Sequence, residues 1–171
     1  MGGKSKLTIV GIEEGEQVHW ITAPSMIKLK EILAMSHEEA LRLNQDYIGI
    51  EHLLLGLLRG GEGLAIKTLR NLDVDPEMLR KTIEDSLSNK LAKTDAKLNN
   101  ISLTKLAENV LKLTVLERIT MKSDAIGTEH LVLSILKNKD NLVTQLLNQY
   151  DINYQVFKTE LERHQIRGPR L

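Results

Sequence analysis

In two places a glutamate is followed directly by a histidine, and these four residues are the ones in this sequence best suited to do chemistry. Glu51-His52 lies in the segment IGIEHLLLGLL, and Glu129-His130 lies in the segment IGTEHLVLSIL. A carboxylate beside an imidazole could transfer protons, bind a metal ion or hold a cationic group of a ligand. Seven of the eleven positions are identical, and the two copies lie 78 residues apart. The pairs therefore belong to an internal repeat, which can duplicate a structural unit, a site, or both.

The spacing within each pair argues against a metal site and against hydrolysis. Neighbouring residues on a helix point to different faces, whereas helical metal-binding pairs are three or four residues apart. A hydrolase would also need a nucleophile, a group that orients the base and donors for an oxyanion. We therefore expect no metal and no catalytic residue, and we expect both histidines to be held by hydrogen bonds in the core. A hydrolase that uses the pairs as acid–base groups stays as an alternative.

The two glutamates have both a structural and a functional interpretation. Glu51 and Glu129 each lie shortly after a glycine, at the start of a predicted buried helix. In the first turn of a helix, a carboxylate offsets the helix dipole and contributes about 0.3–1 kcal/mol. Near a surface, the same carboxylate could bind a guanidinium through two parallel hydrogen bonds. The residues by themselves leave both interpretations open.

The elements that carry these pairs are predicted to be helices. Beyond the N-terminal stretch, apolar residues recur three and four positions apart, which indicates amphipathic helices. The stretch that begins at Glu51 is apolar on nearly every side, which is typical of a buried central helix. Asp75-Pro76 supplies a capping residue and a first-turn proline for a fourth helix. The same order returns 78 residues later, where Glu117 matches Glu39.

We predict an all-α fold of two tandem, pseudo-symmetric four-helix repeats. The predicted parts are an N-terminal extension (1–24), a first repeat (25–87), a polar linker (88–101), a second repeat (102–163) and a C-terminal tail or linker (164–171). The extension contains the β-prone stretches LTIV and QVHWIT, so it forms either a short hairpin or a flexible segment. No other sheet is expected.

The composition narrows the classes of partner. Twenty-three lysines and arginines balance 23 aspartates and glutamates, and only 3% of residues are aromatic, which argues against nucleic acid. No apolar run approaches the roughly 20 residues of a membrane span, and the absence of cysteine fits a reducing compartment, so we expect a cytoplasmic protein. Gly60, Gly61 and Gly63 follow no predicted strand, so a nucleotide-binding loop is not expected. No coiled-coil pattern is present, and we expect the isolated chain to be a monomer.

The repeated segments carry a family resemblance. The stretch EEALRLNQDYIGIEHLLLGLLRGGEGLAIKTL (38–69) closely resembles the N-terminal repeat domain of Clp AAA+ unfoldases, especially the ClpC type. The stretch 103–136 resembles the second repeat of that domain, and the resemblance covers about residues 25–163. It implies a non-enzymatic binding domain that recruits substrate and adaptor proteins. The family passes them to ATP-driven rings, which thread them into a ClpP-type peptidase. ATP would then bind modules outside this chain. A free-standing Clp-repeat protein that docks on a Clp protease complex is the alternative.

The resemblance also implies ligand-binding residues. Some ClpC-type domains bind phosphorylated arginine, and the resemblance places Glu51 and Glu129 at the modified-arginine site of each repeat. Thr128 is expected to cap its own helix and to line a polar site, whereas the first repeat has Ile50 there. Thr104 fits the family pattern at the start of the second repeat, while the first repeat begins differently. On these grounds we expect Glu129 to be the stronger site and Glu51 the weaker.

Overall fold

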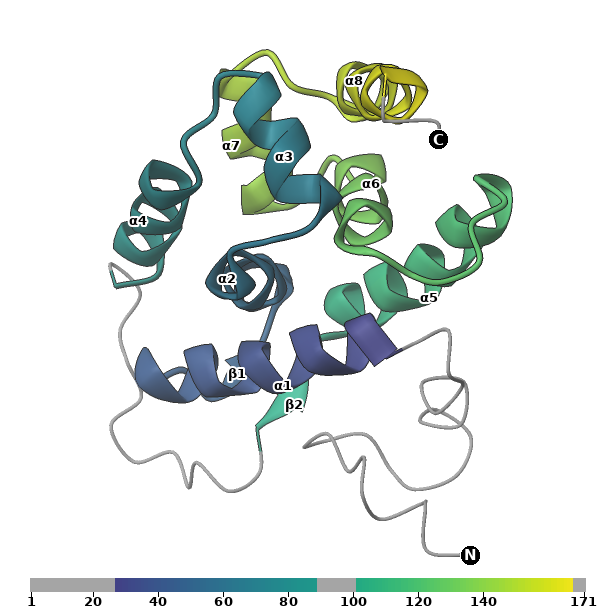
Figure 1. The fold of residues 1–171 in the computed structure, drawn as a ribbon. Helices are drawn as coiled ribbons and strands as arrows, with labels where there is room; N and C mark the ends of the chain where they lie inside the picture. Colours follow the sequence, from purple (N-terminus) through teal and green to yellow (C-terminus); the bar gives the residue numbers. More distant parts are fainter. Residues whose placement is uncertain (1–26, 89–100, 168–171) are drawn as a thin grey trace, which may run out of the picture.

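The computed structural model describes residues 27–88 and 101–167, and almost all of this part is helical (Figure 1). The elements are α1 (Ile27–Arg42), β1 (Tyr47–Ile48), α2 (Ile50–Gly60), α3 (Leu64–Asn71), α4 (Pro76–Ser88), β2 (Ser102–Leu103), α5 (Lys105–Thr120), α6 (Thr128–Lys137), α7 (Leu142–Gln149) and α8 (Tyr154–Arg167). Four helices of one half recur in the same order in the other, which confirms the predicted all-α repeat fold. The predicted N-terminal hairpin lies outside the described residues.

The two halves repeat the backbone as well as the order of helices. Asn44 and Lys122 adopt left-handed conformations with φ of 55° and 56°, and they occupy matching positions after α1 and α5. Asp73 and Asp151 do the same after α3 and α7, with φ of 63° and 60°. Non-glycine residues seldom adopt this conformation. Its recurrence at the same offset shows that the duplication extends to the turns.

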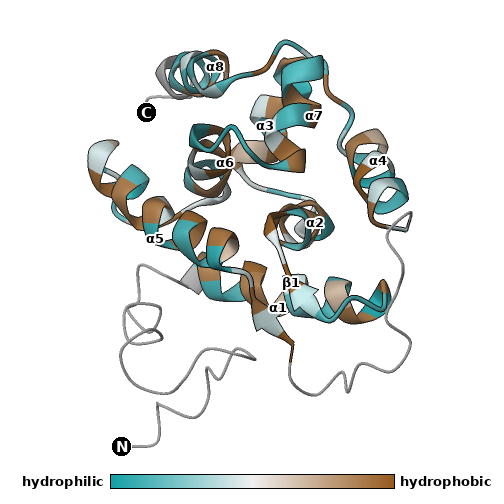
Figure 2. Ribbon diagram, turned by 180° about the vertical axis from the view of Figure 1, so that it is seen from behind, coloured by the Kyte–Doolittle hydropathy of each residue, from teal (hydrophilic) through white to brown (hydrophobic). Residues whose placement is uncertain are grey.

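The helices α2 and α6 lie in the middle of the molecule, with the other helices around them (Figure 2). In both helices nearly every residue is buried, including both histidines. Each of them packs against the preceding helix, α2 against α1 and α6 against α5. The buried apolar residues of both halves form a single cluster, so the two repeats share one hydrophobic core.

The halves are interlocked and do not simply lie side by side. Helix α3 of the first half packs on α6 and α8 of the second, and α2 contacts α5 and α7. In addition, β1 pairs in parallel with β2, with Tyr47 opposite Ser102 and Ile48 opposite Leu103. The expectation of no sheet outside the N-terminal extension is therefore wrong. The extended residues before α2 and α5 lie side by side, and pairing gives their backbone groups hydrogen-bond partners.

Helices α1 and α2 approach each other closely at Gly56. A Cβ atom there would lie 2.8 Å from the backbone oxygen of Ile32 and 2.5 Å from Ser36 Oγ. The Ser36 hydroxyl donates to the Ile32 carbonyl over 2.6 Å. The second half has Ser134 at the matching position, and its hydroxyl donates across the helix pair to the Val110 carbonyl over 2.6 Å.

No helix in the described part of the chain is long and apolar enough to cross a membrane.

The close approach at Gly56 predicts the effect of adding one methyl group. Gly56→Ala should lower the free energy of unfolding by roughly 1–3 kcal/mol, because overpacking forces α1 and α2 apart. Gly60→Ala is the matched control, since a Cβ at Gly60 meets nothing within 4 Å. Urea denaturation of both variants measures the difference. Equal stabilities would contradict the close packing of α1 on α2.

Candidate functional site

Each repeated segment builds the same buried start of a helix. Gly49 precedes α2 and Gly127 precedes α6, and neither glycine has a side chain that could cap. The imidazoles three residues later compensate: His52 Nδ1 accepts a hydrogen bond from Gly49 N over 3.0 Å, and His130 Nδ1 accepts one from Gly127 N over 2.9 Å. The histidines thus perform the function that Glu or Gln has in an ordinary capping box. This confirms the interpretation of both as hydrogen-bonded core residues.

His130 is held in one tautomer by its two contacts. Its Nδ1 accepts from the backbone, so the ring proton lies on Nε2, which is 3.1 Å from Ser123 Oγ and donates to it. Burial lowers the pKa of His130 to about 4, although Glu117 acts in the opposite direction. A histidine that is neutral and engaged at both nitrogens cannot shuttle protons for a substrate. The alternative of a Glu–His hydrolase has no support in this geometry.

The glycines before both glutamates leave room for the carboxylates. A Cβ atom on Gly49 would lie 2.6 Å from Glu51 Oε2, and a Cβ on Gly127 would overlap Glu129 Oε1. Both glutamate side chains therefore fold back over the first turn of their helix. The glycine backbones are extended, so glycine is needed here for space and not for an unusual φ. This physical constraint explains why glycine and glutamate recur together in both copies.

The two carboxylates differ in accessibility. Glu51 is partly exposed, whereas Glu129 is only 6% exposed. Burial raises the pKa of Glu129, and a hydrogen bond from its own backbone amide acts in the opposite direction. A buried carboxylate is the less available of the two for an incoming cation. The geometry therefore favours Glu51, in the reverse of the order expected from the sequence.

Thr128 makes a contact that the sequence did not indicate. It is the first residue of α6 and does not cap that helix, so the expectation of a cap there is wrong. Its Oγ1 instead accepts a hydrogen bond from Ala65 N, 3.0 Å away in the first turn of α3. Gly63, which precedes α3, has no side chain to cap this helix, and a Cβ there would lie 2.6 Å from Thr128 Oγ1. The second half thus caps a helix of the first.

The residues at the matching positions explain why the second half caps a helix of the first, while the first half does not cap a helix of the second. Asn141 takes the place of Gly63, and its Oδ1 accepts from Thr144 N over 2.8 Å, which caps α7 locally. Ile50 takes the place of Thr128, where no hydroxyl is then needed. A borrowed cap in one half and a local cap in the other satisfy the same kind of backbone group.

Thr104 also lies across the boundary between the halves. It caps α5, since its Oγ1 accepts from Ala107 N over 3.1 Å. Its own backbone amide donates to the Ile48 carbonyl over 3.0 Å, and the strand register brings it level with Gly49. Thr104 is therefore beside the turn that carries Glu51, and not with Glu129 as the sequence suggested. The equivalent start of the first repeat, at Ser25-Met26, lies outside the described residues.

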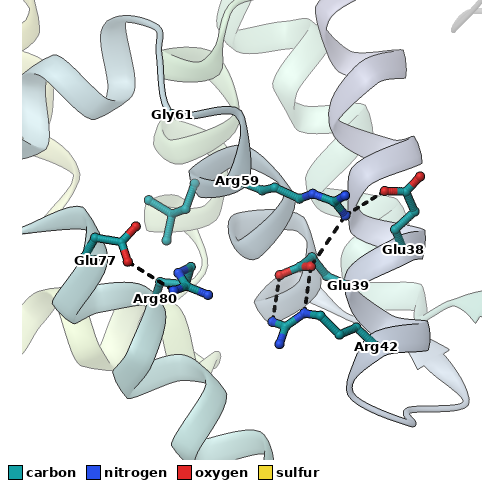
Figure 3. Close-up of a pocket in the computed structure, with 8 residues that line it drawn as sticks. Glu38, Glu39, Arg42, Arg59, Gly61, Glu77 and Arg80 are labelled. Atoms are coloured by element: carbon teal, nitrogen blue, oxygen red, sulfur yellow. Dashed lines mark hydrogen bonds and ion pairs between the residues drawn. The ribbon is translucent and has the colours of Figure 1, made fainter.

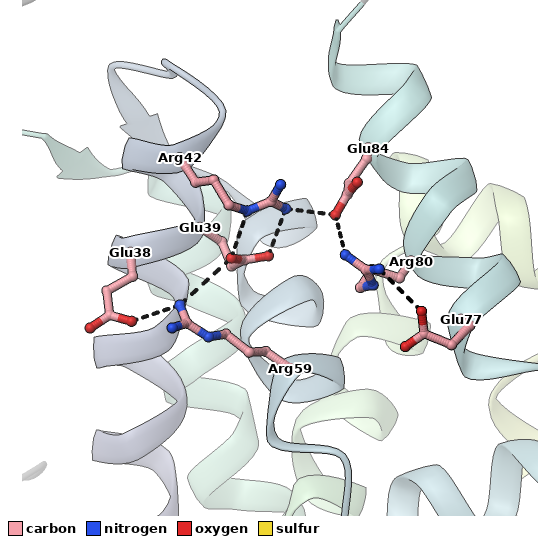
Figure 4. A network of polar contacts seen from close by, with 7 residues as sticks. All are labelled: Glu38, Glu39, Arg42, Arg59, Glu77, Arg80 and Glu84. Atoms are coloured by element: carbon pink, nitrogen blue, oxygen red, sulfur yellow. Dashed lines mark hydrogen bonds and ion pairs between the residues drawn. The ribbon is translucent and has the colours of Figure 1, made fainter.

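A polar network in the first half was not predicted from the sequence (Figures 3 and 4). Buried Glu39 accepts two hydrogen bonds of 3.0 Å from Arg42, and Arg42 also donates to Glu84 over 2.6 Å. Arg80 donates to Glu84 over 2.8 Å. Arg59 pairs with Glu38 at 2.6 Å and lies 3.7 Å from Glu39. These side chains, together with Glu77, join α1, α2 and α4 around a surface groove of about 630 Å³.

One feature of the sequence could have predicted this network, which is the glutamate at the same position of both repeats. The second-half counterpart of Glu39 is Glu117, which is also buried. It forms an ion pair with Lys137 and accepts a 2.9 Å hydrogen bond from the Tyr154 hydroxyl. Burial, followed by this hydrogen bond, raises the pKa of Tyr154 to about 12. An acidic residue buried at one helix position in both halves indicates a fixed cationic partner.

The described residues contain no group of three or more histidine, cysteine, aspartate or glutamate side chains arranged to hold a metal ion. The site is thus a pair of helix starts with carboxylates, together with a charged groove. The family described as the Clp repeat (R) N-terminal domain matches residues 27–150, which include both helix starts. This chain belongs to that family.

Named relatives agree with this assignment to the Clp repeat family. The chain is 32% identical over 126 residues to the negative regulator of genetic competence ClpC/MecB of Bacillus subtilis. It is 31% identical over 126 residues to the chaperone protein ClpB of Oceanobacillus iheyensis. Each match covers 74% of this chain and 15% of the relative, so the chain matches only a small part of these proteins. The Hsp104 N-terminal domain of Candida albicans has the same fold, with a TM-score of 0.67 at 13% identity over 83% of this chain and 90% of that one.

The cap that crosses between the two Clp repeats can be tested by removing one hydroxyl. Thr128→Val should lower the free energy of unfolding by about 1–2 kcal/mol, because the buried amide of Ala65 loses its acceptor. Hydrogen exchange at the Ala65 amide should also accelerate. Thr128→Ser keeps the hydroxyl and serves as the control. If Thr128→Val and Thr128→Ser proved equally stable, the crossing cap would not contribute to stability.

The depressed pKa of His130 predicts a loss of stability in acid. The pKa of His130 is about 6.5 in an unfolded chain and about 4 in the fold. Its contribution to the free energy of unfolding is therefore complete above pH 6.5 and is lost as the pH falls through 4. The shift corresponds to roughly 3 kcal/mol. The raised pKa of Glu129 acts in the opposite sense, because protonation then favours the fold.

Two measurements check this pH dependence. NMR titration of the imidazole should show a neutral ring with the proton on Nε2 down to about pH 5. Chemical denaturation should show that the free energy of unfolding falls less between pH 7 and pH 4 for His130→Gln than for the wild type, because glutamine does not titrate. A ring that titrates near pH 6.5 would contradict its burial in a neutral form.

Proposed function

We propose that this Clp repeat domain recognises substrate and adaptor proteins for an ATP-driven unfoldase, and that its glutamate turns receive phosphorylated arginine. Membership of the family supports the first part, as do relatives that are named ATP-dependent Clp protease ATP-binding subunits. In this proposal the domain is a binding module and not an enzyme. ATP and a ClpP-type peptidase would engage other modules of a larger cytoplasmic protein, and the isolated domain would be a monomer.

The observation that carries the second part is the partly exposed carboxylate of Glu51 at the N-terminus of α2. A carboxylate can bind a guanidinium through two charge-assisted hydrogen bonds. The N-terminus of a helix attracts negative charge, which suits a phosphoryl group. A ligand that carries both groups, such as phosphoarginine, matches this combination better than arginine or phosphate alone.

Thr104 supplies a further polar group at the same turn. Its oxygen accepts from Ala107 N, but its hydroxyl proton remains available to a phosphoryl oxygen. The turn of Glu51 therefore combines a carboxylate from one repeat with a hydroxyl from the other. The turn of Glu129 differs, because its carboxylate is buried and Thr128 is engaged with Ala65. We infer that Glu51 binds more strongly than Glu129, whose side chain would have to move outward first.

Titration with free phosphoarginine tests this proposal. Glu51→Ala should weaken binding by at least about tenfold, since a hydrogen bond between charged groups contributes about 1.5–3 kcal/mol. Glu129→Ala should weaken it less. Isothermal titration calorimetry measures the affinities, and thermal melts verify that each variant is folded. Glu62→Ala, a change at an exposed residue before α3, is the matched control.

The outcomes separate the two parts of the proposal. If the wild type bound no phosphoarginine, the modified-arginine role would be removed and general substrate and adaptor recognition would remain. If both glutamate variants lost melting temperature while binding was unchanged, the glutamates would be structural. Equal binding of arginine and phosphoarginine would remove the role of the phosphoryl group.

A further inference from the structure

The charged groove of the first half is neutralised by its own side chains. Three arginines face four glutamates in the network beside it (Figure 4), and all of these side chains except Glu84 line the groove. Each arginine has at least two carboxylate partners within 4.0 Å. The neighbouring glutamates raise the pKa of Arg42 and Arg80 above the usual value. This groove therefore presents little unpaired charge to a partner.

The corresponding face of the second half has a different charge balance. A shift of 78 residues converts Glu38, Glu39, Arg42, Arg59, Gly61, Glu77, Arg80 and Glu84 into Leu116, Glu117, Thr120, Lys137, Lys139, Gln155, Lys158 and Glu162. Three arginines against four glutamates, a net charge of −1, become three lysines against two glutamates, a net charge of +1. The duplication has kept the scaffold and reversed the sign of the charge on this face.

Two of the three lysines on this face lie beside one aromatic ring. Lys137 Nζ lies 5.3 Å and Lys158 Nζ 5.9 Å from the centre of the Tyr154 ring. Lys137 also pairs with buried Glu117. Lys139 and Lys158 have no carboxylate within ion-pair distance in the described part of the chain. Their charges are therefore available to a ligand.

Apolar side chains continue the face along α5. Leu116 is 54% exposed and Ile119 is 55% exposed, and they lie one helical turn apart. Leu116 occupies the position of Glu38, whose carboxylate reaches Arg59 in the first half. By the same register, Leu116 is next to Lys137. Large apolar side chains that are exposed together and rimmed by polar residues are typical of an interaction surface.

We propose that Leu116, Ile119, Lys137, Lys139 and Lys158, named here the lysine face, bind a segment of a partner protein that carries acidic and apolar side chains together. The lysines would pair with carboxylates, and the two apolar side chains would be covered by apolar residues of the segment. The lysine face is separate from the turns of Glu51 and Glu129. Binding at one surface therefore does not require the other.

A short fluorescent peptide of leucine and glutamate residues is the probe. It should bind the chain and bind more weakly as salt is added, because exposed charge pairs are screened. Peptides with lysine for every glutamate, or serine for every leucine, should bind at least about tenfold more weakly. Fluorescence anisotropy measures the affinities. Amide shifts of the labelled chain should be concentrated at the C-terminal half of α5, the C-terminal end of α6 and the start of α8.

The variants avoid Lys137, because its loss would leave buried Glu117 without its cation. Lys139→Glu/Lys158→Glu should weaken peptide binding by about tenfold or more. Leu116→Glu, which introduces the residue type of the first half, should also weaken it. The control is Lys67→Glu/Lys81→Glu, which changes the net charge equally at exposed lysines of α3 and α4. It should bind the peptide like the wild type.

Three results would overturn this inference. They are no binding of the leucine–glutamate peptide, amide shifts located elsewhere, and equal effects of the two double variants. Glu51→Ala should bind the peptide normally, so a failure of phosphoarginine binding leaves this test unaffected. Melting curves of every variant distinguish loss of the surface from loss of the fold.

Discussion

Burying a helix at the centre of a small domain also buries the unpaired backbone groups of its first turn. This constraint affects α2 and α6 equally, because both begin inside the shared core. Glycine at each start makes space for a carboxylate, and the histidine three residues later accepts the glycine amide. The repeated glycine, glutamate and histidine therefore act together, and none of them can be explained by itself.

The same constraint connects the two repeats. Where a local cap is missing, at Gly63, a hydroxyl from the other repeat supplies it, and where Asn141 caps locally, the partner position is apolar. The short parallel pairing of β1 with β2 follows the same rule, since it gives partners to extended backbone that enters the core. The two repeats have one core and exchange hydrogen bonds, so neither is complete without the other.

Duplication of the scaffold has left the outer faces free to diverge. Both repeats keep a buried glutamate, Glu39 and Glu117, with a cation from the following helix beside it. Around this pair, the first repeat forms a network of arginines and glutamates, while the second presents lysines, a tyrosine and exposed apolar residues. If the domain recognises several proteins, as proposed, such differences let two similar halves bind chemically different partners.

The sequence by itself determined the local features of this protein. Helical periodicity, the Asp75-Pro76 start of α4 and the 78-residue offset predicted the all-α class, the order of the helices and the burial of α2 and α6. These features are predictable because they depend on side chains a few positions apart, which interact within one helix or turn.

Only the tertiary structure decided which residues meet across the two repeats. Thr128 caps a helix 63 residues earlier in the chain, and Thr104 joins the turn of Glu51 rather than that of Glu129. The burial of Glu129 and the pairing of β1 with β2 likewise depend on how the repeats interlock. Spacing along a chain carries no information on such contacts, because they form only when the two halves pack into one core.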